Sequence, residues 1–440
     1  MNDLKTLAHI ACEEAIRAGA DFADVSISRG RNTRLNVEKN GIHDMRERRS
    51  AGVSVRAIVN GGRAFASTSR IDEASIRETA QRAAAAAKIA EPDPDFVSLP
   101  GPAEYAVIEG LRDDRVAAID PPTLINALMT EVDGARAVDS RAIVEGGAGT
   151  SEGESVIVNS LGVEGMSAST SVSLHVSCVI RVGDDVGSYY DYTSGRVLDD
   201  FTPGGLGARV CEQTKRFLNQ RTCKTAVLPI IAGPIAASSF IGALASAANA
   251  EHIQRGRSYL IGKRGEKIGP DFLTIVDDPF IPRGMGSGPF DDEGAPAQRV
   301  AIIENGVLVN WLHGSYTANK ADEPNNGHGT RSGGVSLSNV NPALGDKTAA
   351  ELIAETKEGI YIDRGNLAPS MASGELSATV DFGFKIENGE LVYPLKNTMI
   401  GIGVWDMLNN LEAISSDYRA EPGSIMPTIR IAGVRVAGGD

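Results

Sequence analysis

Two stretches of the sequence nearly repeat each other: IENGVLV at residues 303–309 and IENGELV at residues 386–392. Each places Asn-Gly between two short runs that favour strands. Asn and Gly tolerate the positive φ angles that a two-residue hairpin turn requires, so each stretch predicts a tight β-hairpin with Asn305-Gly306 or Asn388-Gly389 at its tip. Around them the chain is rich in glycine and turn signals. The sequence therefore predicts a strand-rich C-terminal domain over residues 223–440, with helices only at 234–250, 348–357 and 403–410.

The first half of the chain alternates helices with antiparallel strands. Residues 1–90 form a predicted N-terminal module in which helices flank short alternating runs, and a second module with the same element order is predicted at 123–222. Between the modules, residues 91–122 hold six prolines, which predict a linker because proline interrupts helices and central strands. The predicted fold class is α+β: N-terminal helix and antiparallel-strand modules followed by a strand-dominated C-terminal domain.

The amino-acid composition indicates which kinds of molecule this protein can bind. The chain has 440 residues, of which 42% are hydrophobic and 23% charged, as expected for a globular protein. It carries 43 basic and 57 acidic residues, a net charge of −14. Nucleic acid and anionic membrane surfaces attract basic proteins, so we expect neither as a partner and instead expect a protein, a peptide or a small molecule.

The four cysteines predict a reducing environment. Cys12, Cys178, Cys211 and Cys223 occur singly, without the spacing of a zinc knuckle or a disulfide framework. The N-terminal stretch mixes charges into its apolar positions, unlike a secretory signal, and no long uncharged apolar window suggests a membrane span. We therefore expect a cytoplasmic protein.

Few residues suggest chemistry of their own. Of the six histidines, the closest two in sequence are His313 and His328, too far apart for a paired-histidine helix that binds zinc. Asp291-Asp292-Glu293 forms an acidic cluster before Gly294, and His328 lies between two glycines. Adjacent carboxylates can bind a cation or raise one another's pKa, although acidic turns without chemistry are more common.

The order of several motifs resembles the TldD/PmbA family, whose members are also described as modulators of DNA gyrase. The resemblance covers essentially the whole chain, and the residues that carry it cluster in the second half. They are FLTIVDDP (272–279), PFDDEG (289–294), IIENGVL (302–308), WL (311–312), SYTA (315–318), IENGELVYP (386–394) and PGSIMP (422–427).

The resemblance implies a choice between two branches. TldD-like members carry a helix with the pattern His-Glu-three residues-His and a late cysteine, which bind zinc for peptide hydrolysis. The PmbA branch, also called TldE, lacks these residues and assembles with a TldD-like subunit. Here the corresponding helix, residues 236–247, has no His or Glu, the late position reads Glu421-Pro422-Gly423-Ser424, and no cysteine follows Cys223. This chain therefore resembles the TldE type.

The resemblance implies a non-catalytic subunit of a heteromeric zinc metalloprotease that cleaves unfolded or flexible peptides. The chain itself would hold no cofactor and no catalytic residue, and the zinc would belong to a TldD-like partner. Candidate contacts to the substrate chamber or the partner are Asp291, Asp292, Glu293 and His328. Three alternatives remain: a regulatory or peptide-binding assembly protein, a homodimer of the isolated chain, and a stand-alone hydrolase that uses unconventional ligands among His252, His313, His328 and Asp291.

Overall fold

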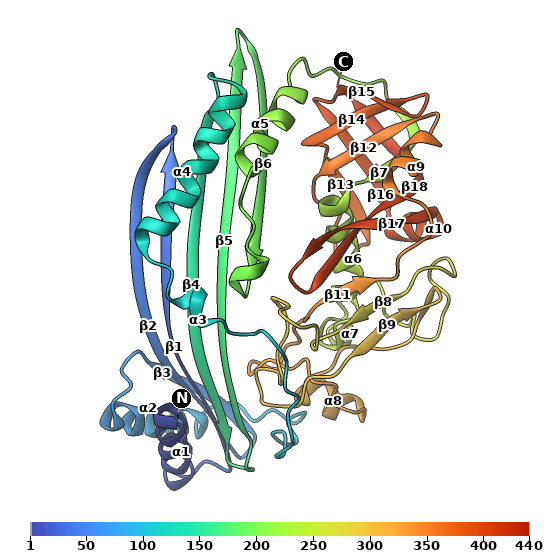
Figure 1. Cartoon of the computed structure of the whole chain (residues 1–440). Coiled ribbons are helices and arrows are strands. Elements are labelled where there is room, and N and C mark those ends of the chain that lie inside the picture. The colour runs from blue at the N-terminus through green and yellow to red at the C-terminus, as the bar shows by residue number, and fades with distance from the viewer. Residues whose placement is uncertain (1, 440) are drawn as a thin grey trace.

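One antiparallel sheet of six long strands dominates the first half of the molecule (Figure 1). The computed structural model describes residues 2–439. The strand order is β3-β2-β1-β4-β5-β6, so β1 of the first predicted module pairs with β4 of the second. The two segments therefore share a single sheet. The strands are β1 (Phe22–Glu38), β2 (Gly41–Val59), β3 (Gly62–Thr68), β4 (Ile143–Asn159), β5 (Glu164–Val182) and β6 (Asp185–Gly195).

Two pairs of helices cover the two ends of the same sheet face. Helices α1 (Asn2–Arg17) and α2 (Glu73–Ala87) pack at one end, over a core that includes Val25 and Ile27. Helices α4 (Pro121–Val138) and α5 (Leu206–Arg216) pack at the other end, over Leu35 and Val37. These four β1 residues share a face because side chains alternate along a strand. Figure 1 shows the helix pairs separated along the strands.

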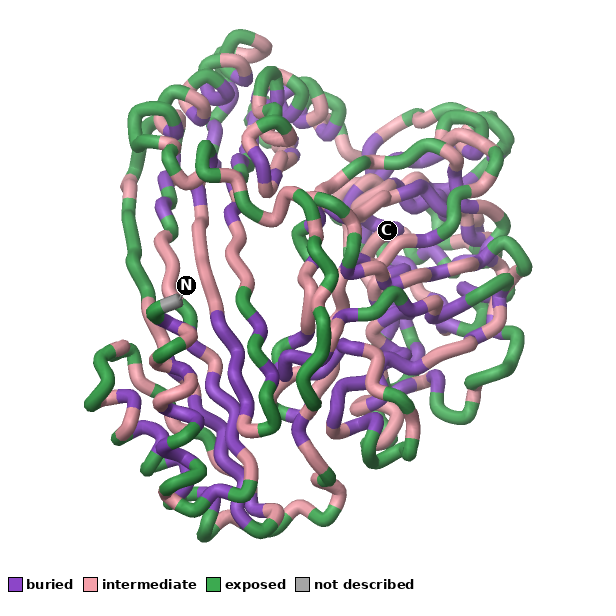
Figure 2. Tube along the Cα trace, turned by 60° about the horizontal axis from the view of Figure 1, so that its bottom comes forward, coloured by how far each residue is buried: buried purple, intermediate pink, exposed green. Residues whose placement is uncertain are grey.

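In β1 and β4, the two central strands, the middle is less buried than the parts under the helix pairs (Figure 2). The segment between the two modules crosses the sheet there, on the helix side. It contains the short helix α3 (Asp114–Ala117), and the Leu111 carbonyl accepts a hydrogen bond from the Thr170 backbone N–H of β5. A short 3-10 helix, η1 (Leu198–Asp200), follows β6.

The second half contains two further sheets. A four-stranded sheet has the order β10-β9-β8-β11, and a larger sheet has the order β13-β16-β18-β7-β12-β14-β15, with β17 paired to β18. The strands are β7 (Ala226–Ala232), β8 (Ile275–Asp277), β9 (Val300–Glu304), β10 (Val307–Leu308), β11 (Val340–Pro342), β12 (Glu358–Arg364), β13 (Glu375–Thr379), β14 (Phe382–Glu387), β15 (Glu390–Pro394), β16 (Thr398–Gly403), β17 (Leu411–Glu421) and β18 (Ser424–Gly438).

Helix α6 (Pro234–Ala247) contributes to the core of this half. Its Phe240 and Leu244 belong to the same buried cluster as Ile230 of β7 and Ile431 of β18. The remaining helices are short: α7 (Ala250–Gln254), α8 (Ser315–Ala321), α9 (Ala349–Ala354) and α10 (Val404–Asn409).

The predicted α+β class and both predicted hairpins are confirmed. Asn305-Gly306 connects β9 to β10 and Asn388-Gly389 connects β14 to β15, and all four residues have positive φ angles. The strands of the N-terminal half are longer than expected, because the alternation near Val25 and near Leu35 belongs to one continuous β1. Among residues 2–439, no helix combines the length and the apolar composition needed to cross a membrane.

Candidate functional site

A cavity of about 420 Å³ lies beside one face of helix α6. Ser238, Ile241 and Gly242 of that helix form one wall, and the turn from β17 to β18 forms another. Residues from distant parts of the chain complete the lining: Tyr192, Ser194, Met285, Gly286, Leu337, Ser338, Asn339, Val340, Pro342, Glu421, Pro422, Ser424, Ile425 and Met426. Because Tyr192 and Ser194 belong to β6, both halves of the molecule contribute to this cavity.

Two asparagine side chains hold the loops of the cavity together. Asn339 accepts a hydrogen bond from the Gly286 N–H at 3.0 Å and donates one to the Asp278 carbonyl at 2.7 Å. Asn341 donates to the Gly423 carbonyl at 3.0 Å and accepts from the Ile425 N–H at 2.7 Å. Buried backbone groups require such partners, so the amides fix both loops against β11.

Charges at the cavity are neutralised by neighbours. Arg419 donates from Nε to Glu421 Oε1 at 2.6 Å and from Nη1 to Asp191 Oδ1 at 2.7 Å, and its guanidinium lies 4.7 Å from the centre of the Tyr192 ring. Burial by itself would raise the pKa of Asp191, but the hydrogen bond from Arg419 and the positive charges of Arg364 and Arg419 lower it below its usual value. The carboxylates near the cavity are therefore held as ion pairs.

The cavity does not fit a zinc ion. Protein zinc ligands are Cys, His, Asp and Glu side chains, and a hydrolytic site uses about three of them. The α6 wall offers Ser238, Ile241 and Gly242, and the one carboxylate of the lining, Glu421, is paired with Arg419. Among residues 2–439, no group of three or more His, Cys, Asp or Glu side chains is placed to hold a metal ion.

One of the predicted contact residues, Glu293, joins the halves of the molecule. Glu293 Oε1 lies 3.1 Å from Nη1 of Arg56, on β2, and Glu293 Oε2 accepts a hydrogen bond from the Ser315 N–H at 3.0 Å. Arg56 also pairs with Asp24 of β1, and Arg331 pairs with the same aspartate. Arg56, Asp24 and Glu293 are all buried, so this network is an internal connection between the N-terminal sheet and the C-terminal half.

The other three predicted residues lie around the same network. Asp291 is buried and accepts hydrogen bonds from the backbone N–H groups of Glu293, Ala295 and Gly329. His328 is also buried, with Nδ1 2.8 Å from the Asn326 carbonyl oxygen and Nε2 3.3 Å from Asp277 Oδ2. Asp292 is exposed.

None of these four residues lines the cavity at α6. Contact of Asp292 with a partner remains a prediction.

We expect the stability of the protein to depend on pH, because Asp291 is buried next to the carboxylate of Glu293. Burial and the neighbouring Glu293 carboxylate raise the pKa of Asp291 to about 7, although backbone N–H donors act in the opposite direction. The folded state therefore retains a proton that the unfolded chain loses near pH 4, and this stabilisation disappears as the pH rises toward 7. Between pH 5 and pH 8, we expect the wild type to lose about 2 kcal/mol more unfolding free energy than Asp291→Asn. Urea unfolding at both pH values measures this difference, and parallel pH profiles would exclude it.

Gly242 gives a second prediction, because it lies inside helix α6 and faces the cavity. A Cβ atom at this position meets no atom within 4 Å. Gly242→Ala is therefore expected to raise the free energy of unfolding by about 0.5–1 kcal/mol through the lower entropy of the unfolded chain. Gly207→Ala is the matched contrast, because its Cβ would lie 1.8 Å from the Glu131 carbonyl oxygen, and we expect it to destabilise the protein. Thermal unfolding of the two variants checks the opposite signs.

Comparison with known proteins identifies the family. Three family models match: PmbA/TldA metallopeptidase domain 1 at residues 23–87, the central domain at 114–218 and the C-terminal domain at 225–438. The chain belongs to the PmbA/TldD metallopeptidase family.

The similarity to known proteins extends over nearly the full length of this chain. Metalloprotease PmbA of Escherichia coli O157:H7 is 27% identical, over 94% of this chain and 93% of the relative. The PmbA homologue of Haemophilus influenzae is 28% identical, over 96% and 94%. The crystal structure of TldE from Thermococcus kodakarensis matches with a TM-score of 0.89 at 26% identity, over 99% of this chain and 100% of that one. A Bacteroides thetaiotaomicron protein described as a modulator of DNA gyrase matches with a TM-score of 0.90 at 26% identity, over 100% of both chains.

Proposed function

We propose that this chain is the non-catalytic, TldE-like subunit of a heteromeric zinc metalloprotease that cleaves unfolded or flexible peptides in the cytoplasm. The observation that carries the proposal is the cavity beside α6. The two segments that the family resemblance assigns to zinc binding, the helix after Pro234 and the stretch at 421–424, both line it. The helix presents a hydroxyl, an apolar side chain and a glycine, and the one carboxylate of the stretch, Glu421, is paired with Arg419. A TldD-like subunit would supply the zinc ion, which polarises the peptide carbonyl and activates water when bound.

The cavity supports a role in enclosing a peptide. Its walls combine small polar groups, such as Ser238 and Ser338, with apolar ones, such as Ile241 and Leu337. A lining of this kind can contact peptide backbone and varied side chains without demanding one sequence. Glu421 is paired with Arg419, which leaves it poorly suited to act as a general base. The chain would thus shape a substrate chamber while its partner performs the hydrolysis.

Reconstitution with a TldD-like protein from the same source tests the proposal. Each chain is purified alone, the two are mixed, and size-exclusion chromatography and cleavage of an unfolded fluorescent peptide are measured. We expect a mixed complex, with cleavage that requires the TldD-like subunit. A stable homodimer that excludes the partner, or a mixed complex whose cleavage rate equals that of the partner alone, would instead favour an assembly or regulatory role. Cleavage by this chain alone, abolished by replacing His252, His313, His328 or Asp291, would favour a stand-alone hydrolase.

A further inference from the structure

The cavity at α6 borders an edge strand of the four-stranded sheet. β11 is the last strand in the order β10-β9-β8-β11, and its Val340 and Pro342 line the cavity. The inner edge of β11 pairs with β8, where Val340 lies opposite Asp277. Among residues 2–439, no strand pairs with the outer edge of β11. The cavity therefore meets a strand whose outer backbone groups are available for pairing.

The register of β11 shows which of its backbone groups face outward. The Asp278 N–H donates to the Asn339 carbonyl at 3.0 Å, and the Ala343 N–H donates to the Thr274 carbonyl at 2.9 Å. In an antiparallel pair, successive residues direct their backbone groups alternately toward the partner strand and away from it. Val340 follows Asn339 and therefore directs both its N–H and its C=O away from β8. These two groups can exchange two hydrogen bonds with one residue of an added antiparallel strand.

The lining next to Val340 is apolar. Val340 packs against the buried cluster that includes residues of α6. Residues directly opposite each other in a sheet project their side chains to the same face. A residue paired with Val340 would therefore point its side chain toward α6, where Ile241, Leu337 and Met426 line the cavity.

Among the described residues that line the cavity, none offers an unpaired charge to a ligand. Glu421 is the one charged residue of the lining, and its carboxylate is paired with Arg419. A charged side chain that entered the cavity would lose its water without gaining an ionic partner, which costs free energy, whereas burial of an apolar side chain is favourable. The lining therefore favours an aliphatic or aromatic residue.

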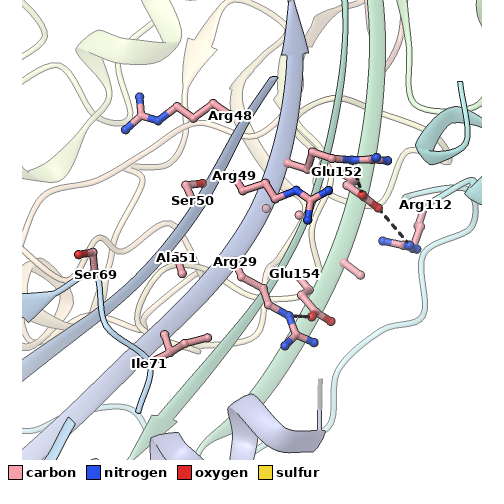
Figure 3. Close-up of a pocket in the computed structure, with 14 residues that line it drawn as sticks. Arg29, Arg48, Arg49, Ser50, Ala51, Ser69, Ile71, Arg112, Glu152 and Glu154 are labelled. Atoms are coloured by element: carbon pink, nitrogen blue, oxygen red, sulfur yellow. Dashed lines mark hydrogen bonds and ion pairs between the residues drawn. The ribbon is translucent and has the colours of Figure 1, made fainter. Parts of the chain in front are cut away.

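A larger hollow, of about 930 Å³, lies on the helix side of the N-terminal sheet and differs from the cavity at α6. Figure 3 shows the charged side chains of its wall. Arg29 pairs with Glu154, and both Arg31 and Arg112 pair with Glu152. These charges are satisfied within the chain, so they do not indicate a ligand. The cavity at α6 instead combines outward-facing backbone groups with an apolar lining.

We propose that an extended peptide pairs through its backbone with Val340 at the outer edge of β11, and that the paired residue places an aliphatic or aromatic side chain in the cavity at α6. This inference rests on the proposed function, because it names the substrate class of the same cavity. Backbone pairing accepts many sequences, and the cavity selects for apolar character. Apolar residues are mostly buried in folded proteins and become accessible in unfolded ones, so this recognition favours unfolded segments.

Fluorescence anisotropy with this chain alone tests the selection for apolar residues. The probe is a short labelled peptide of Gly, Ser and Thr with one central Leu, and the comparison peptides carry Glu or Lys at the same position. We expect the Leu peptide to bind at least about tenfold more tightly than either charged peptide. Equal binding of all three peptides would overturn the proposal.

Val340→Pro tests the backbone pairing. It removes the proposed donor but no hydrogen bond of the sheet, because an edge strand tolerates proline where the N–H faces outward. We expect it to weaken binding of the Leu peptide about tenfold, and Val340→Ala, which keeps the N–H, to weaken it less than about threefold. Circular dichroism and thermal unfolding verify that each variant folds. Equal losses in the two variants would overturn the proposal.

Gly242→Leu tests the cavity independently of the strand. A Cβ atom at Gly242 meets no atom within 4 Å, so the leucine side chain would extend into the cavity. We expect it to weaken binding of the Leu peptide at least about tenfold. Gly101→Leu is the control, because Gly101 is exposed, lies outside the cavity and also has no atom within 4 Å of an added Cβ, and it should change affinity less than about twofold. Equal affinities of the two variants would contradict a site at α6.

These measurements need no TldD-like subunit, so their failure is distinguishable from failure of the proposed function. Cleavage by the mixed complex without selective peptide binding by this chain would overturn the inference and leave the proposed function standing. Selective binding by this chain, with a mixed complex that cleaves no faster than the TldD-like subunit alone, would support the peptide site and contradict its role in proteolysis.

Discussion

Replacing the zinc ligands of the TldD-like subunit is expected to reduce peptide cleavage by the mixed complex to background, because those ligands would hold the metal that activates water. The matching changes in this chain, Ser238→Ala and Glu421→Gln, should leave kcat within about twofold, since neither side chain would take part in the chemical step. Steady-state cleavage by purified complexes measures both, with size-exclusion chromatography to verify that each variant still assembles.

The zinc content of the purified proteins is an independent test of the prediction that the TldD-like subunit holds the metal. After mild dialysis, this chain alone should contain no stoichiometric zinc, and the mixed complex should contain about one zinc ion for each TldD-like subunit. About one tightly bound zinc per isolated chain, or a loss of kcat by orders of magnitude in Glu421→Gln, would contradict the division of roles between the two subunits.

The buried Arg56 should be the most sensitive position for stability. Its side chain is 2% exposed and contacts the carboxylates of Asp24 and Glu293. Arg56→Ala would leave Glu293 buried without its cation, so we expect it to lower the free energy of unfolding by about 3–5 kcal/mol. Arg264→Ala is the control, because Arg264 is 39% exposed in its pair with Glu323 and should cost less than about 1 kcal/mol.

Urea unfolding followed by fluorescence and circular dichroism compares the two variants. If both probes give the same transition, unfolding is two-state and one free energy of unfolding describes each variant. If Arg56→Ala costs no more than Arg264→Ala, the network around Glu293 does not stabilise the contact between the two halves.

The sequence predicted local structure where one physical signal acts over a few residues. Asn305-Gly306 and Asn388-Gly389 are at hairpin tips because their positive φ angles suit that turn and few others. The continuity of β1 could not be predicted, because helices cover only its two ends. In between, Arg29 and Arg31 occupy the face that is apolar at Val25 and Leu35, so the alternation of apolar and polar residues is interrupted.

The candidate site was only partly predictable. The resemblance singled out the helix after Pro234 and the stretch at 421–424, but their meeting at one cavity depends on the packing of α6 beside the β17–β18 turn. Ser338 and Asn339 carry no distinctive chemistry in the sequence. The contact between Arg56 and Glu293 joins residues 237 positions apart, and no local pattern indicates such a pair.

The central position of β1 has a consequence for folding during synthesis. β1 pairs with β2 on one side, but its other neighbour, β4, follows the whole intervening segment, so that Val25 meets Val158. Until the ribosome has released β4, the first three strands have an open inner edge in addition to the outer edge of β2. High contact order slows such pairing, and an unpaired edge can associate with other nascent chains. The protein should therefore be most prone to aggregation on the ribosome between completion of β3 and emergence of β4.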